Sequence, residues 1–102
     1  MAVVEVSITP LGTGTTGVSP YVAGCVGIVR DSGLAHQLTP MGTIIEGELD
    51  DILRVIRLMH ESPFAAGAAR VSTLIKIDDR RDRDHTMSGK MRSVEDKLGD
   101  RT

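Results

Sequence analysis

The side chains that can form directed polar contacts alternate with aliphatic ones along three segments, residues 3–9, 43–48 and 70–77. In an extended strand, residues two apart share a face, so each segment presents one apolar and one polar side. The polar side collects Glu5, Ser7, Thr9, Glu46, Glu48, Ser72 and Lys76. Hydroxyl donors beside acceptor carboxylates on rigid strands suit a polar ligand, although such a face is more often simply solvated.

Catalytic and metal-binding constellations are not indicated. Glu46 and Glu48 lie two apart and can pair their carboxylates, but no nucleophile or oxyanion site accompanies them. His36, His60 and His85 have no i, i+4 spacing among them, and metal ligation needs converging ligands. The single cysteine excludes an intrachain disulfide. We therefore expect neither an enzyme nor a metal site.

The glycines of residues 12–17 (GTGTTG) match the bare pattern G-x-G-x-x-G. The segment lacks the lysine of a P-loop, and no acidic residue ends the second predicted strand, so dinucleotide binding is disfavoured. A ligand-flanking or interface loop is the better interpretation. The balanced charges of residues 78–84 predict a solvated run or, alternatively, ion pairs between subunits.

Composition limits the function classes. The 102-residue chain has a net charge of -2, one Tyr, one Phe and no Trp. Binding of single-stranded nucleic acid usually needs a basic groove and aromatic platforms, so a nucleic-acid partner is not expected. No apolar run approaches the ~20 residues of a membrane span, and the first residues do not resemble a secretory signal. We expect a cytoplasmic protein.

The periodicities predict seven elements within one domain, residues 1–102. Strands are expected at 3–9, 34–39, 43–48 and 70–77, and helices from Ser19 to Gly33, from Asp50 to Gly67 and over 88–98. The order β-α-β-β-α-β is typical of the ferredoxin-like α+β fold: a four-stranded antiparallel sheet with two helices on one face. The helix at 88–98 is an addition to this plan.

Local signals sharpen the expectation. Ser19 is predicted as an N-cap with Pro20 at the first helical position, and Asp50 as the N-cap of the next helix. Gly24 is interpreted as allowing its helix to approach the sheet closely. Val4, Val6, Ile8, Val71, Ile75 and Ile77 are expected beneath the helices, which leaves the polar side bare.

The chain also resembles a known family, the YkoF/YqgV-like thiamine-binding proteins. The resemblance covers nearly the whole sequence and rests on SITPLGTGTTGVSPYVA, LTPMGTIIEGELDDI, RVSTLIKIDDRRD and the HTM before the last helix. It implies a ferredoxin-like fold, homo-oligomers (dimers or tetramers) that pack through their sheets, and binding of thiamine or its hydroxymethylpyrimidine half without turnover. No other cofactor is implied.

Thiamine carries an aminopyrimidine, which needs carboxylate or hydroxyl partners, and a cationic thiazolium. The residues assigned to it by face and motif are Ser7, Thr39, Met41, Thr43, Glu46 and Ser72, with Met41 against a ring through its sulfur. Tyr21 is the one candidate for stacking. Two alternatives stay open: a regulatory or scaffold module whose sheet face serves only for assembly, and an enzyme acting on a small heterocycle.

Overall fold

The four strands form one antiparallel sheet in the order β2-β3-β1-β4. The structure, a computed structural model, describes residues 1–14, 16–82 and 86–99. Its elements are β1 (Ala2–Leu11), α1 (Ser19–Ser32), β2 (Ala35–Thr39), β3 (Gly42–Gly47), α2 (Leu49–Ala65), β4 (Arg70–Asp79) and α3 (Met87–Gly99). The ferredoxin-like α+β prediction is confirmed, with β1 and β3 in the centre. His85 and the last two residues of the predicted charged run 78–84 lie outside the described residues.

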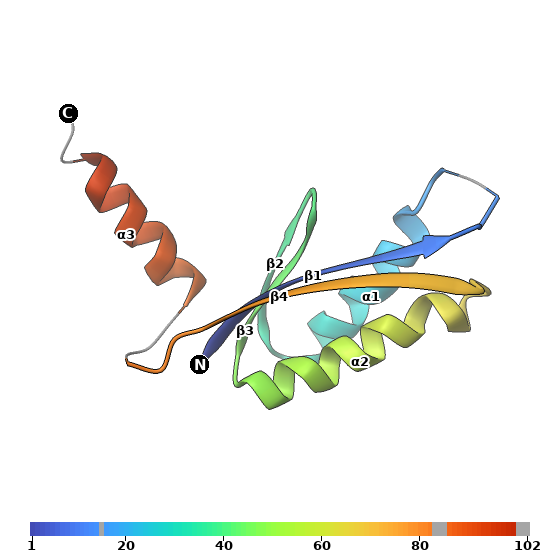
Figure 1. Ribbon diagram of the computed structural model, residues 1–102, viewed down its shortest axis with the longest axis horizontal. Coiled ribbons are helices and arrows are strands. Elements are labelled where there is room, and N and C mark those ends of the chain that lie inside the picture. The colour runs from blue at the N-terminus through green and yellow to red at the C-terminus, as the bar shows by residue number, and fades with distance from the viewer. Residues whose placement is uncertain (15, 83–85, 100–102) are drawn as a thin grey trace.

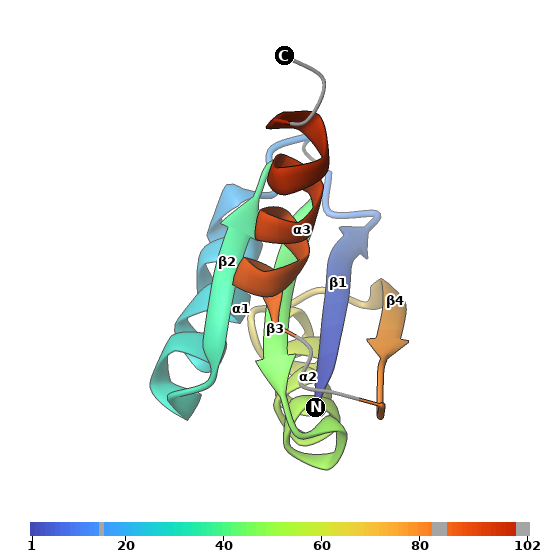
Figure 2. The same ribbon diagram turned by 90° about the vertical axis from the view of Figure 1, so that its left-hand side faces the viewer.

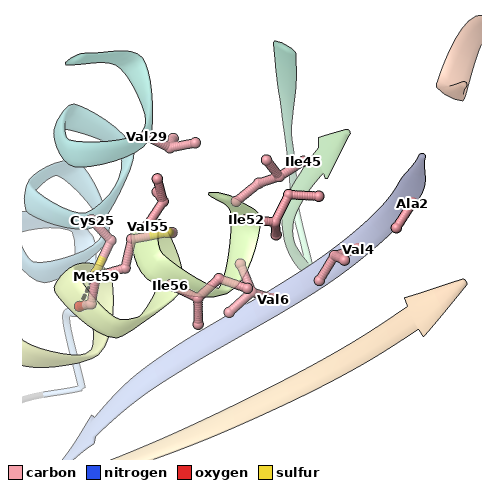
Figure 3. Close-up of a cluster of buried hydrophobic side chains, with 10 residues drawn as sticks. All are labelled: Ala2, Val4, Val6, Cys25, Val29, Ile45, Ile52, Val55, Ile56 and Met59. Atoms are coloured by element: carbon pink, nitrogen blue, oxygen red, sulfur yellow. Dashed lines mark hydrogen bonds between the residues drawn. The ribbon is translucent and has the colours of Figure 1, made fainter. Parts of the chain in front are cut away.

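Helices α1 and α2 cover the same side of the sheet (Figure 1), and the aliphatic core lies between the two layers. Val4, Val6 and Ile45 enter it from the sheet and are at most 2% exposed. The helices contribute Cys25, Val29, Ile52, Val55, Ile56 and Met59 (Figure 3). Burying each aliphatic side chain of this kind stabilises the fold by about 1.5–3 kcal/mol.

Strand register establishes which residues share a face. Val4 pairs with Ile45 on one side and Ile77 on the other, and Glu5 pairs with Ile44 and Lys76. Directly opposed residues of a ladder point to the same side, so the predicted apolar and polar faces are confirmed. Ile75 and Ile77, both expected beneath the helices, nevertheless remain 41% and 45% exposed, because β4 is an edge strand that α2 covers only in part.

Several local expectations need correction. The N-cap of α1 is Val18, with no side-chain cap, so Ser19 already belongs to the first turn. The N-cap of α2 is Glu48 rather than Asp50, because β3 ends at Gly47 and the helix follows at once. A Cβ on Gly24 would lie 2.9 Å from Ser62 Oγ, so this glycine makes room for α2 and not for the sheet.

Helix α3 stands beyond the end of the sheet, on the side opposite α1 and α2 (Figure 1), and it lies nearest the viewer in Figure 2. Its first turn is held by two contacts to the bare face. The Met87 N–H donates to Glu46 Oε2 at 2.7 Å, and Lys90 Nζ lies 2.5 Å from Asp78 Oδ2. None of its residues is buried. Among the described helices, none is both long and apolar enough to cross a membrane.

Candidate ligand-binding site

A hollow of about 200 Å³ opens between the start of α1 and the β2–β3 hairpin, and we call it the hairpin hollow. Strand β1 and Met59 of α2 close its inner side. Its volume is below the ~300–1,000 Å³ of pockets for drug-sized ligands, so it matches a single ring with small substituents. The lining residues are Val6–Thr9, Val18, Val22, Cys25, Leu38–Thr43 and Met59.

The hollow exists because the hairpin ends before β1 does. Register between β1 and β3 runs from Ala2 to Val6, while β1 continues to Leu11 beside β4 alone. Residues 7–9 therefore face no strand on the β3 side, and all three line the hollow. Ser7 is among them, so the strand edge brings polar groups to an otherwise aliphatic wall.

The turn of the hairpin is fixed by Thr39 and Gly42. Thr39 Oγ1 donates to the Gly42 carbonyl at 2.8 Å and accepts from the backbone N–H groups of Met41 and Gly42 at 3.3 and 3.2 Å. A Cβ on Gly42 would lie 2.9 Å from the Val6 carbonyl oxygen, so only glycine lets the turn approach β1 this closely. Thr39 thus shapes the hollow, and its hydroxyl is already engaged.

Thr43 supplies a hydroxyl with no partner among the residues that the structure describes. It pairs with Val6 in the ladder, faces the helices and is 5% exposed. No group in residues 1–14, 16–82 or 86–99 lies in hydrogen-bonding position to its Oγ1, although the residue lines the hollow. Burying a hydroxyl unsatisfied costs about 1–3 kcal/mol. A ligand that hydrogen-bonds Thr43 recovers this cost.

Three sulfur-bearing residues, Cys25, Met41 and Met59, add polarisable surface to the hollow. Cys25 is buried and its Sγ donates to the Met59 carbonyl oxygen at 3.4 Å, as drawn in Figure 3. Burial raises the pKa of this thiol, so it stays protonated at neutral pH and offers no thiolate nucleophile. Met41, 81% exposed at the tip of the hairpin, places a thioether at the rim. Thioethers make favourable contacts with aromatic rings.

The sequence-predicted site residues divide into two groups. Ser7, Thr39, Met41 and Thr43 come together around the hollow. Glu46 lies on the opposite face of the sheet, where its carboxylate accepts the Met87 N–H. Ser72 is exposed on β4 opposite Thr9 and is not part of the lining. The sequence placed the site on the bare face, whereas this hollow lies on the helix side.

Sequence reasoning missed the wall provided by α1. Val18, Val22 and Cys25 form an apolar stripe at helical spacing along the start of α1, and all three line the hollow. The end of the hairpin decides which residues of this stripe contact the sheet and which line an open hollow, and the stripe alone does not reveal this. Tyr21, the predicted stacking residue, does not belong to the lining.

A second depression lies at the other end of the sheet, between Met1 and Arg81. Its two arginines each pair with an aspartate of the same depression. Arg80 binds Asp82 through Nε at 2.6 Å, and Arg81 Nη2 lies 2.8 Å from Asp79 Oδ2. Because these guanidinium groups already have carboxylate partners, the hairpin hollow is the stronger candidate site.

The fold and the hollow together define a small α+β sandwich with a hollow of single-ring size between a helix and a hairpin. The sequence profile of a family described as thiamine-binding protein matches residues 4–95. The chain belongs to this family.

Curated relatives and solved structures agree with this assignment. The UPF0045 protein YqgV of Bacillus subtilis is 48% identical over 98 residues, covering 92% of this chain and 94% of the relative. The crystal structure of the hypothetical protein MJ1052 of Methanocaldococcus jannaschii superposes with a TM-score of 0.84 at 36% identity, covering 92% and 95% of the two chains. A Thermotoga maritima protein with a suggested role in thiamine biosynthesis or salvage shares the fold, with a TM-score of 0.76, 16% identity and coverage of 91% and 97%.

Proposed function

We propose that this protein binds thiamine or its hydroxymethylpyrimidine half without turnover, as a homo-oligomer in the cytoplasm. The observation that carries the proposal is the buried, unpartnered Thr43 hydroxyl in a hollow sized for one ring. Membership of the thiamine-binding family supports the choice of ligand.

The pyrimidine ring is the half that the hollow favours. An aminopyrimidine presents ring nitrogens and an amino group that can bond to Thr43 and to the polar edge of β1 at Ser7. Its faces would lie against the aliphatic and sulfur-containing wall formed by Val22, Cys25 and Met59. The thiazolium would project past Met41 into solvent, where its positive charge stays hydrated and costs no desolvation.

Calorimetric titration tests the proposal with three ligands: thiamine, hydroxymethylpyrimidine and the isolated thiazole alcohol. Thiamine and the pyrimidine should bind with similar affinity, and the thiazole should give no heat. Mass spectrometry of the ligand after prolonged incubation should recover it unchanged. Binding of the thiazole alone, or conversion of the ligand, would contradict the proposal.

The alternative function is a module used only for assembly. Two exposed apolar surfaces favour it: Leu74 on the bare sheet face, 74% exposed, and the stripe of Met91, Val94 and Leu98 on α3. The same titrations separate the two functions, because an assembly module gives no heat with any of the three ligands.

A further inference from the structure

A second hollow adjoins the hairpin hollow along α1, and we call it the α1 groove. It has a volume of about 380 Å³ and lies between α1 and the edge strand β2. Val18, Val22 and Leu38 line both hollows, so the two share a wall. The other residues that line the groove are Ser19, Ala23, Val26 and Arg30. A substituent on a ring in the hairpin hollow can therefore extend over the shared wall into the groove.

The charge of the two hollows has one sign. The chain holds 14 Asp and Glu residues, yet none of the described residues that line either hollow is acidic. Within the same lining, Arg30 supplies the charged group. The first turn of α1 contains no acidic residue either, so no carboxylate there offsets the positive end of the helix dipole beside Val18. The groove therefore favours an anionic substituent over a cationic one.

The Arg30 guanidinium has no ion pair or side-chain hydrogen bond within the part of the chain that the structure describes. By contrast, Arg57 and Arg80 each bind a carboxylate. The sequence explains the difference, because residues three and four apart are neighbours on a helix, and those preceding Arg30 at this spacing are Val26 and Gly27. The N–H donors of Arg30 are therefore available to a ligand.

Helix geometry places these donors within reach of a short tail. Val22, in the shared wall, lies eight residues before Arg30, which is about 12 Å along the helix axis. Helical side chains lean toward the N-terminus, so an extended arginine leaves a gap of roughly 5–6 Å. A phosphate carried on one methylene group extends roughly 4–5 Å beyond its ring, and a charge-assisted hydrogen bond adds about 2.8 Å. The tail and the gap therefore match in length.

We infer that the site takes the phosphate ester of hydroxymethylpyrimidine, with the ring in the hairpin hollow and the phosphate in the α1 groove at Arg30. The inference rests on the proposed function and names the form of ligand that the site prefers. The bonds of the methylene group rotate, so an anionic substituent turns toward Arg30. A thiazolium in the same position is repelled and stays in solvent past Met41. Guanidinium and phosphate match in shape and form bidentate hydrogen bonds.

Calorimetric titration of hydroxymethylpyrimidine and of its phosphate tests the inference. The wild-type protein should bind the phosphate about tenfold more tightly than the free alcohol. Arg30→Gln, which keeps a good helix former, should remove this advantage and leave the affinity for the free alcohol unchanged. Arg92→Gln is the matched control, because it makes the same change at an exposed arginine of α3 that lines neither hollow. This control should keep the full advantage.

Salt provides a second readout. Raising the salt concentration from about 50 to about 500 mM should reduce the advantage of the phosphate in the wild-type protein, since exposed charges are screened. The free alcohol is uncharged at its hydroxymethyl group, so its affinity should change little. A phosphate advantage that does not respond to salt would overturn the pairing with Arg30.

Each result of the titrations is decisive. Equal affinities for the alcohol and its phosphate would overturn the inference and leave the proposed function standing, whereas no binding of either would overturn both. An advantage that survives Arg30→Gln would place the phosphate elsewhere and overturn the inference alone. Thiamine phosphate should show no Arg30-dependent gain over thiamine, because its thiazolium carries the phosphate into solvent. An equal gain would contradict the assignment to the pyrimidine ester.

Discussion

The substitution Thr43→Val should make the free protein more stable and the complex weaker. Valine has nearly the shape of threonine and an equally good strand propensity, so the change removes only the hydroxyl. Thr43 as a residue is 5% exposed, and its hydroxyl has no partner among the described residues. Replacing an unsatisfied buried hydroxyl by a methyl group should stabilise the ligand-free fold by about 1 kcal/mol.

The opposite sign is expected for binding. If the pyrimidine hydrogen-bonds Thr43 in the hollow, the variant leaves a polar ligand atom against a methyl group. The loss should be about 1–2 kcal/mol, which is roughly a 5–30-fold weaker dissociation constant. Stability and affinity therefore move in opposite directions, which a purely structural role for Thr43 does not predict.

Thr73→Val is the matched control. Thr73 shares the helix-facing side of the sheet, but its Oγ1 lies 2.6 Å from His60 Nδ1 and it is not part of the hollow. This variant should lose about 1 kcal/mol of stability and keep its affinity. Urea unfolding measures the first quantity and calorimetric titration of hydroxymethylpyrimidine the second. A destabilised Thr43→Val protein with unchanged affinity would refute the reasoning.

Three further predictions follow from the hollow and its surroundings. Gly42→Ala brings a Cβ to 2.9 Å from the Val6 carbonyl and should lower the free energy of unfolding by about 1–3 kcal/mol in urea titrations; an unchanged midpoint would mean that the turn can move aside. Because burial raises the pKa of the Cys25 thiol, the folded state keeps a proton that the unfolded chain loses first. Stability should be full at neutral pH and should fall as pH rises above the ordinary thiol pKa, by more than in Cys25→Ala; equal slopes would contradict this. Glu46→Gln should leave pyrimidine affinity unchanged and accelerate amide exchange of Met87, since the carboxylate holds that N–H at 2.7 Å; weaker binding would return Glu46 to the site.

The sheet was predictable because its signals are local and mutually consistent. Alternation at Val4 and Val6 establishes a face regardless of what lies across it, and the register with Ile45 confirms that face. Helix starts were less predictable. Ser19 and Asp50 are good caps in isolation, but the lengths of the preceding loop and strand decide where each helix begins, and both begin earlier.

The site depends on strand ends and was therefore only partly predictable. Ser7, Thr39, Met41 and Thr43 were assigned by strand face and by motif, and they meet because β3 stops pairing with β1 at Val6. If β3 continued to pair with β1 for two more residues beyond Val6, the strand would occupy the space of the hollow. The wall formed by Cys25 and Met59 is a tertiary contact across 34 residues of sequence, for which no local signal exists.

The position of the pyrimidine ring is the central claim, and a crystal structure of the protein with hydroxymethylpyrimidine tests it most directly. We predict density for one ring in the hairpin hollow, with a ring nitrogen or the amino group within hydrogen-bonding distance of Thr43 Oγ1. A ring bound instead on the bare sheet face beside Leu74, with the hollow filled by solvent, would contradict the account.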